Sequence, residues 1–433
     1  MNSLRCDGLS RRSLLSLGFA GALGWSLTDI TAAAARPMSP FGIKPAESLI
    51  LIWLDGGLSH IDSFDPKPNA PSEIRGPFAG IRSSIPGIAL SEHLPMLASR
   101  LNQVTLIRSL THELGNHDTG GHFVLTGHRA NPALNPPSIG SLIAARNQGR
   151  AGMPAYSTIG RMQDFLGAGY LPQSTRPFAV TPGSSQGATL LGPDGHIEDV
   201  WARRLSTLSS LTKLSAALDG GVVTPGDGAT GRALGMLTSS SVLSAFQVEK
   251  EPAGVRQRYG NGAIGRNLLL ARRLTGAGCR VVQVVDTGYD THVDIHRELP
   301  DARFPGSGKL PSLDRGISAL LDDLTESGRI DTTVVAVVSE FGRTPKLNAS
   351  AGRDHWPRAG SVLLAGGPFA RGMVFGATDA RGESPMDAAV SPADIAATLL
   401  TAFGIDPGET VRTPDGRPVQ RIAGGAVIKS LFA

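Results

Sequence analysis

The stretch SLILIWLDGG at residues 48–57 decides the fold, because a mostly apolar run leads directly into an aspartate and two glycines. Two later stretches repeat this pattern, namely VVQVVD at residues 281–286 and TVVAVVSE at residues 333–340. Short β-branched runs that end in turn residues are typical of strands buried on both faces of a parallel sheet. We therefore expect three core strands, each with a polar carboxyl end.

Helical patterns precede two of these strands. Apolar residues recur at helical spacing from Ala263 to Thr275 and again from Leu313 to Leu324. Ser391 suits the N-cap of a last helix, and Pro392 suits its first position. The stretch VTLI at residues 104–107 predicts one more strand. Alternating helices and strands imply right-handed crossovers. The sequence thus predicts an α/β fold, with a mostly parallel central sheet and helices on both faces.

Acidic and histidine side chains gather where these strands end. The carboxyl ends of strands line the ligand crevice of open α/β sheets, and carboxylates and imidazoles bind divalent cations. Asp and Gly are also common in plain strand-end turns, but the three strand ends and the segment GRDHW at residues 352–356 together favour a metal site. The candidate ligands are Asp55, Asp290, His292, His296, Glu340, Asp354 and His355.

The composition excludes some classes of protein. Lys and Arg (41) exceed Asp and Glu (37) by only four and the arginines do not cluster, so the chain does not have the pattern of a nucleic-acid-binding protein. The two cysteines are Cys6, near the start of the chain, and Cys279. If an N-terminal leader is removed, neither an intramolecular disulfide nor a thiolate metal cage is possible.

The first 35 residues have the organisation of such a leader. SRRSLL at residues 10–15 opens a short apolar stretch, and AAAA at residues 32–35 supplies small residues before a cleavage point. Paired arginines ahead of the apolar stretch are typical of signals read by the twin-arginine export machinery. A membrane anchor is the alternative, but the apolar stretch is short and broken by glycines.

We therefore expect a periplasmic or extracellular protein without a membrane span in its mature chain. Residues 1–35 would form the signal peptide and residues 36–47 a loose arm. Residues 48–433 would form one domain, with a loop-rich insertion near residues 150–230 that is rich in Gly, Ser, Thr and Pro.

Export gives a first testable prediction. Replacing both arginines, Arg11→Lys with Arg12→Lys, should leave the protein in the cytoplasm, because the export machinery recognises the arginine pair itself. The measurement is immunoblotting of cytoplasmic and periplasmic fractions, with a cleaved periplasmic protein of known route as the fractionation control. Normal export of the double variant would refute the twin-arginine assignment.

Several long strings resemble one bacterial family. WLDGGLSHIDSFDPK at residues 53–67, EIRGPF at residues 73–78 and SEFGRTP at residues 339–345 are similar to hallmarks of the domain-of-unknown-function 1501 family. Its members carry twin-arginine leaders and belong to the alkaline phosphatase and sulfatase superfamily. SPADIAATLL at residues 391–400 is similar to a helix near the end of sulfatases. The resemblance implies an alkaline-phosphatase-like fold.

The superfamily implies two metal positions that flank a nucleophile. By resemblance, Asp55 matches the aspartate that binds metal at the end of the first strand. Asp290 and His292 resemble an Asp and a His that hold one cation, and His296 is the alternative to His292. Glu340 stands where an Asp-His pair is usual, and Phe341 replaces that histidine. His355, beside Asp354, resembles the closing ligand. The implied cofactor is a divalent cation such as Zn, Ca, Mg or Mn.

The segment HDTGGHFVLTGH at residues 117–128 resembles the sulfatase segment that carries the nucleophile. Counting back from Thr126 and Gly127, the nucleophile position falls on His117, and Thr119 is the nearest hydroxyl. Imidazole can form covalent intermediates, although His117 could equally be a metal ligand or a general acid. Arg343 could bind an anionic group or form a structural ion pair with Glu340.

The resemblance thus implies an exported metal-dependent hydrolase of phosphate or sulfate esters. Its substrate would be an anionic ester, for example a sulfated or phosphorylated carbohydrate. The alternative is a catalytically lapsed member of the superfamily that binds a ligand, a polysaccharide or a protein in the same crevice. The loss of a histidine at Phe341 and the lack of Ser or Cys at His117 favour this alternative.

Overall fold

The computed structural model describes residues 42–146, 149, 153–180, 240–300 and 309–433. The expected signal peptide at residues 1–35, the first part of the expected arm and residues 181–230 of the expected insertion lie outside the described residues. In the part of the chain that is described, no helix combines the length and the apolar character needed to cross a membrane.

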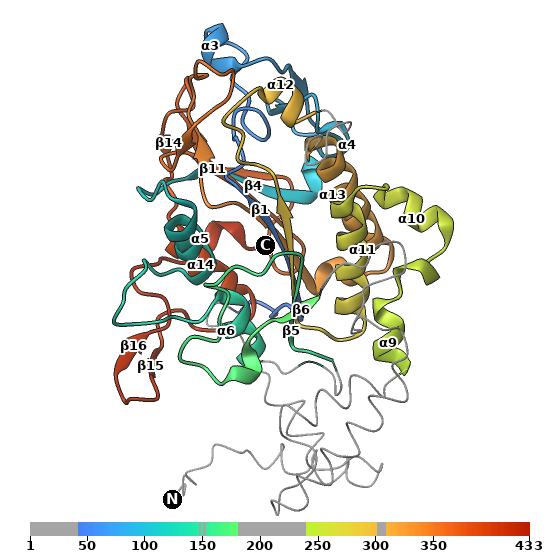
Figure 1. Ribbon diagram of the computed structural model, residues 1–433, viewed down its shortest axis with the longest axis vertical. Helices are drawn as coiled ribbons and strands as arrows, with labels where there is room; N and C mark the ends of the chain where they lie inside the picture. Colours follow the sequence, from blue (N-terminus) through green and yellow to red (C-terminus); the bar gives the residue numbers. More distant parts are fainter. Residues whose placement is uncertain (1–41, 147–148, 150–152, 181–239, 301–308) are drawn as a thin grey trace, which may run out of the picture.

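An eight-stranded sheet forms the centre of the domain (Figure 1). Only β11 runs antiparallel to its neighbours β4 and β8, and the other strand pairs of this sheet are parallel. The strands, in spatial order, are β12 (Met373–Phe375), β4 (Val104–Leu110), β11 (Gly360–Ala365), β8 (Thr333–Val338), β1 (Ser48–Asp55), β7 (Val281–Thr287), β5 (Tyr156–Ile159) and β6 (Phe178–Val180). The predicted mostly parallel sheet is confirmed.

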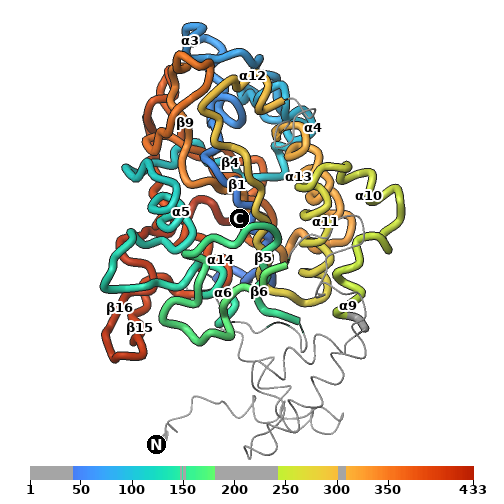
Figure 2. Tube along the Cα trace, in the orientation of Figure 1, coloured from blue at the N-terminus to red at the C-terminus, as the bar shows by residue number. Residues whose placement is uncertain are grey.

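Strand β1 divides its side chains between two apolar cores. Ile50, Ile52 and Leu54 belong to the core that contains α4 (Pro95–Ser99), α11 (Ala263–Gly276) and α13 (Lys309–Glu326). The alternate side chains, with Trp53 among them, belong to the core of α5 (His117–Thr126), α6 (Ile139–Arg146) and α14 (Pro392–Ala402). Because both faces of the strand are covered, its run is apolar throughout. Figures 1 and 2 show the two helical layers on opposite sides of the sheet, which confirms the predicted α/β fold.

The last helix begins as its sequence predicts. The side chain of Ser391 accepts a hydrogen bond from the backbone N–H of Asp394, whose carboxylate in turn accepts from the Ser391 N–H at 2.8 Å. This capping box satisfies two donors that the first turn leaves without partners, and Pro392 occupies a position where no donor is needed.

Smaller elements surround the sheet. The remaining helices are α3 (Ser72–Arg75), α9 (Ser240–Phe246), α10 (Ala253–Tyr259) and α12 (Ile295–Glu298). The two-stranded ladders are β2 (Gly80–Arg82) with β3 (Ala89–Ser91), β9 (Gly342–Arg343) with β10 (His355–Trp356), β13 (Ala377–Thr378) with β14 (Pro385–Asp387), and β15 (Thr410–Arg412) with β16 (Pro418–Gln420). Single 3₁₀ turns span Leu101–Gln103, Gln173–Thr175, Val248–Lys250, Arg329–Asp331 and Lys429–Leu431.

Residues 153–180 differ from the loop-rich insertion expected near residues 150–230. They contribute β5 and β6, which extend the central sheet beyond β7. Both strands are short and lie among glycines and prolines, so their periodicity is too weak to separate them from a loop. The segment that follows β5 reaches the cavity described below.

Candidate metal centre

The carboxyl ends of three central strands lie level with one another. Asp55 at the end of β1 is in register with Thr287 of β7, and Trp53 is in register with Val338 of β8. Loops that leave these ends therefore meet at one edge of the sheet, where open α/β folds bind ligands.

Three side chains form a close triangle at this edge. The Oδ1 atom of Asp290 lies 3.0 Å from Nε2 of His292 and 3.3 Å from Nε2 of His355. The two Nε2 atoms are themselves 3.0 Å apart. A tetrahedral cation with bonds of about 2.0–2.1 Å holds its ligand atoms roughly 3.3 Å apart, so these spacings fit one ion.

The hydrogen bonds of the two rings fix which nitrogen atoms are free. His355 donates its Nδ1–H to the carbonyl oxygen of Gly115 at 2.8 Å, and His292 donates its Nδ1–H to Asp354 Oδ1 at 2.8 Å. The bond from His292 lowers the pKa of Asp354, which therefore accepts as a carboxylate. Because each ring donates through Nδ1, the two Nε2 atoms face each other and are the ring atoms available to a cation. The donor set therefore fits a metal ion.

Asp354 thus orients His292, the histidine 62 residues before it, and not His355 beside it as the sequence suggested. Asn348 donates a second hydrogen bond to the same oxygen at 3.1 Å. Adjacent residues on the extended backbone of a strand point to opposite sides, which separates Asp354 from the ring of His355. Asp354 acts on the centre through His292.

Arg343 and Gly56 hold Asp290 in place. The Arg343 guanidinium is fully buried and donates to Asp290 Oδ1, to the carbonyl oxygen of Gly57 at 2.9 Å and to that of Arg353 at 3.0 Å. Burial raises the pKa of Asp290, but the hydrogen bond and charge of Arg343 outweigh it and keep the pKa below its ordinary value. Gly56 has a φ of +117°, and a Cβ there would lie 2.4 Å from the Asp290 backbone nitrogen.

His117 lies next to the triangle, on the first turn of α5. Its Nε2 atom is 3.5 Å from Asp290 Oδ2, and its Nδ1 atom is 2.7 Å from Glu340 Oε1. The hydrogen bond to Glu340 raises the pKa of His117, and burial opposes the shift. Asn116 fixes the start of α5 by accepting hydrogen bonds from the N–H groups of the first turn. Ligand atoms of His117, Asp290 and His355 lie within 4.8 Å of one another, so these three side chains are a second set that could hold the ion.

Glu340 and Phe341 support these rings from behind. Glu340 is fully buried, and its carboxylate accepts from the Gly56 N–H at 2.7 Å and from the Ser339 hydroxyl at 3.0 Å as well as from His117. It reaches the centre through His117, whereas the sequence predicted a direct ligand. Phe341 packs its ring 5.2 Å from that of His117 and 4.7 Å from that of His355. An apolar ring therefore occupies the side of the centre where the superfamily pattern suggested a second histidine.

A buried ion pair anchors the loop that leads to His355. The side chains of Arg353 and Asp62 are both fully buried, with Arg353 Nε 2.6 Å from Asp62 Oδ2. Arg353 also donates to the carbonyl oxygens of Thr344, at 3.0 Å, and Ile74, at 2.9 Å. The pair ties the segment after β1 to the loop between β9 and β10, and so fixes the start of the GRDHW string at residues 352–356.

Other predicted residues lie away from the triangle. His296 is exposed on α12 with its ring 6.3 Å from that of Phe78, so the structure selects His292 over His296. The Thr119 hydroxyl donates to the carbonyl oxygen of Asn116 at 3.4 Å. Three further histidines bond to backbone carbonyl oxygens: His112 to Glu340, His122 to His128, and His128 to Arg421.

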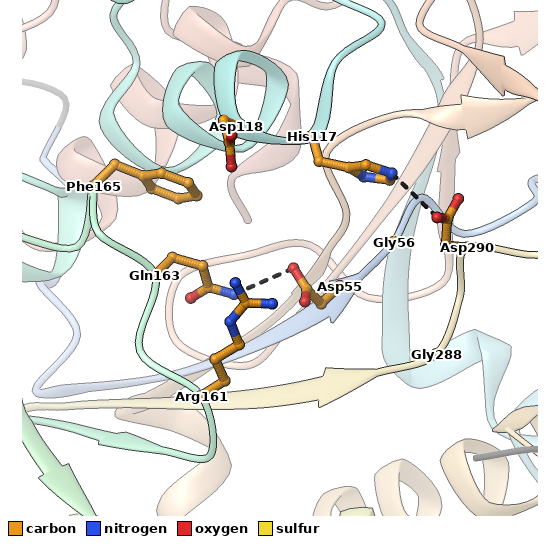
Figure 3. A pocket seen from close by; sticks show the side chains of 9 residues that line it. All are labelled: Asp55, Gly56, His117, Asp118, Arg161, Gln163, Phe165, Gly288 and Asp290. Atoms are coloured by element: carbon orange, nitrogen blue, oxygen red, sulfur yellow. Dashed lines mark hydrogen bonds and ion pairs between the residues drawn. The ribbon is translucent and has the colours of Figure 1, made fainter.

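A cavity of about 260 Å³ opens beside His117 and Asp290 (Figure 3). Asp55 lines it, and the Asp55 carboxylate accepts from Trp53 Nε1 at 2.9 Å and from Gln163 Nε2 at 3.3 Å. Asp55 is therefore a cavity residue beside the triangle, not one of its corners. Among the remaining lining residues are Asp118, Arg161, Gln163 and Phe165.

Sequence reasoning missed the residues of the 161–165 segment, because they follow a strand too short to recognise. Their alternation was the available signal: Arg161, Gln163 and Phe165 line the cavity, whereas Met162 packs against the apolar core. Alternation of this kind is typical of an extended segment with one face toward a site.

Comparisons with known proteins agree with the sequence resemblance. The model of a family described as "Protein of unknown function (DUF1501)" matches residues 46–432. No curated protein matches the sequence. The fold is similar to a protein in the alkaline phosphatase superfamily from Vibrio parahaemolyticus, at 11% identity over 88% of this chain and 70% of that chain, with a TM-score of 0.41.

Two further solved structures are also similar in fold. One is a phosphonate monoester hydrolase from Silicibacter pomeroyi, at 13% identity over 88% of this chain and 78% of that chain, with a TM-score of 0.36. The other is a sulfatase from Pseudoalteromonas sp., at 14% identity over 84% of this chain and 68% of that chain, also with a TM-score of 0.36.

Proposed function

This chain belongs to the family of proteins of unknown function DUF1501, and from that premise we propose that it is an exported, metal-dependent hydrolase of phosphate or sulfate esters. The observation that carries the proposal is the triangle of Asp290 Oδ1, His292 Nε2 and His355 Nε2 beside an open cavity. A divalent cation held there supplies charge that polarises the ester oxygens and stabilises the leaving oxygen.

His117 is the residue to which we assign the attack on the ester. Its Nδ1–H is held by Glu340, which leaves a lone pair on Nε2, and this residue lines the cavity. An imidazole held by a carboxylate is oriented and is stabilised when its ring gains positive charge. Thr119 is less suited, because its hydroxyl is directed to the carbonyl oxygen of Asn116 and it does not line the cavity.

The reaction has two balanced steps. A bond forms between His117 Nε2 and the phosphorus or sulfur atom while the bond from that atom to the ester oxygen breaks. The departing alkoxide takes a proton from a water molecule and leaves as the alcohol. The hydroxide that remains attacks the same phosphorus or sulfur atom and displaces Nε2, and Glu340 balances the positive ring charge in between.

The alcohol part of the ester is, in our proposal, a carbohydrate. The cavity wall combines the aromatic ring of Phe165 with the carboxylates of Asp55 and Asp118. Rings with both hydroxyl groups and apolar faces suit such a wall, since carboxylates accept from hydroxyls and an aromatic face packs on C–H groups. The cavity, about 260 Å³, is slightly smaller than the range of about 300–1,000 Å³ that is usual for small-molecule sites, which suits a single ring.

Metal content tests the proposal directly. The variant His355→Ala removes one corner of the triangle and should bind far less metal than the wild type, which should hold about one ion per chain. His296→Ala is the matched control, because His296 is exposed and lies outside the triangle. The measurement is elemental analysis of each purified protein after dialysis.

Activity completes this test. Turnover of phenyl phosphate and phenyl sulfate should disappear after dialysis against a chelator and return when the metal is restored. Equal metal content in His355→Ala and His296→Ala would contradict the assigned ligands. A wild type that binds metal at the triangle yet hydrolyses no ester would instead support a binding protein with a lapsed catalytic centre.

A further inference from the structure

The segment that follows β5 faces the cavity with every second side chain. Arg161, Gln163 and Phe165 come from this segment and lie opposite the first turn of α5, which carries His117 and Asp118 (Figure 3). Strand β5 pairs with β7, so the segment borders the cavity on the side away from β8 and from the loop of His355. The strands β5 and β8 are three positions apart, about 14 Å.

Arg161 is an available cation in this wall. Its side chain is exposed, and no ion pair or hydrogen bond joins it to another residue in the described ranges of the chain. Arg343, by contrast, is fully buried and already donates hydrogen bonds to Asp290 and to backbone carbonyl oxygens. An arginine that lines a cavity without a protein carboxylate as partner can bind an anionic group of a ligand.

Gln163 is a nearly buried polar residue of the same cavity wall. It is only 8% exposed, and its Nε2 atom donates to Asp55 Oδ1 at 3.3 Å. Its Oε1 atom is buried and has no partner among the described residues. A buried acceptor without a donor is costly, and a ligand hydroxyl or a water molecule would satisfy it.

Phe165 is held rigidly between this segment and α5. A Cβ at Gly121 of α5 would lie 2.8 Å from the Phe165 ring, so the ring packs directly on the helix backbone. The ring of His122 meets it edge-on at 6.2 Å between centroids. Phe165 and Gln163 are therefore held by packing and a hydrogen bond, whereas the exposed Arg161 side chain can adjust to a ligand.

We propose that Arg161 binds a second anionic group of the substrate, one that is not the reacting ester, while Gln163 Oε1 accepts from a hydroxyl between the two groups. The inference rests on the proposed function, and it narrows the substrate to esters of acidic carbohydrates such as those that carry a carboxylate. Arg161 is assigned to this second group because it comes from the side of the cavity away from β8, whereas the triangle is completed from the loop beyond β8.

Matched substrates separate this role from a role in the reaction itself. We expect Arg161→Gln to lower kcat/KM for 4-carboxyphenyl sulfate about tenfold while changing that for 4-acetylphenyl sulfate by less than about twofold. The corresponding pair of phosphate esters, 4-carboxyphenyl phosphate and 4-acetylphenyl phosphate, should show the same difference in kcat/KM. The variant Arg161→Lys should restore part of the preference for the carboxylated ester. Arg176→Gln is the control, because Arg176 is exposed and does not line the cavity.

Binding of unreactive sugars keeps the inference separate from the hydrolase proposal. By calorimetry, the wild type should bind methyl galactosiduronate more tightly than methyl galactoside, and Arg161→Gln should lose that preference. Retention of this pattern in a protein that hydrolyses no ester would overturn the hydrolase proposal and leave the anion site standing. An equal loss of kcat/KM for both sulfates, or no preference for the uronate, would overturn the role given to Arg161.

Discussion

His117→Ala is expected to abolish ester turnover while the protein stays folded and keeps its metal. The variant removes the Nε2 atom that faces the cavity, and a group that attacks or transfers protons typically contributes about 100- to 10,000-fold to the rate. The triangle of Asp290, His292 and His355 remains, because its ring nitrogen atoms are oriented by Asp354 and Gly115 and not by His117. The measurements are kcat/KM, metal content and the thermal midpoint.

Thr119→Ala is the matched control for this prediction. It removes a side chain from the same turn of α5 whose hydroxyl is directed to Asn116, so turnover should change little. Loss of metal in His117→Ala to the same extent as in His355→Ala would identify His117 as a ligand and refute its role in attack. Full turnover by His117→Ala would refute both roles.

Asp62→Asn is expected to destabilise the domain by about 3–5 kcal/mol, because it leaves the charge of Arg353 buried without a carboxylate. The midpoint of urea denaturation should fall accordingly. The loop between Arg343 and His355 depends on the same pair, so the metal content of the variant should fall as well.

The control for this prediction is a pair on the surface. Asp331→Asn breaks the ion pair between Asp331, whose side chain is 70% exposed, and Arg371, whose side chain is 50% exposed. This change should alter the free energy of unfolding by no more than about 1 kcal/mol. The double variant Asp62→Leu with Arg353→Met should lose less stability than the sum of the two single variants, since no charge is left buried. Equal effects of Asp62→Asn and Asp331→Asn would contradict the importance given to the buried pair.

The sequence predicted the strands and helices whose apolar period is strong. The β1, β7 and β8 runs are apolar because both faces of each strand are buried, and this cause acts directly on residue choice. The short strands β5 and β6 were missed, because three or four residues do not establish a period. The place of β5 in the sheet depends on pairing with β7, a contact between residues far apart in sequence, and β6 joins the sheet through β5.

For the site, the sequence identified candidate residues. It did not distinguish those that lie at the centre from those that contact it through another side chain. The structure brings Asp290, His292 and His355 together, whereas Glu340 and Asp354 each accept a hydrogen bond from a histidine. Carboxylates in either position look alike in a sequence, since binding a cation and orienting an imidazole need the same oxygen atoms. The choice between His292 and His296 likewise depended on the path of the loop after β7.

The position of β5 toward the outer part of the sheet has a consequence for how this protein can diversify. The groups of the proposed centre stand at the start of α5, in the loop after β7 and on β10, where buried arginines and close packing constrain replacement. Residues 161–165 follow β5, which is next to the last strand of the sheet, and belong to no helix or strand. Under the proposed function, changes in this short stretch would alter the selectivity for the carbohydrate and leave the proposed centre unchanged. Replacing these five positions together would therefore change the cavity wall without touching the side chains of the triangle.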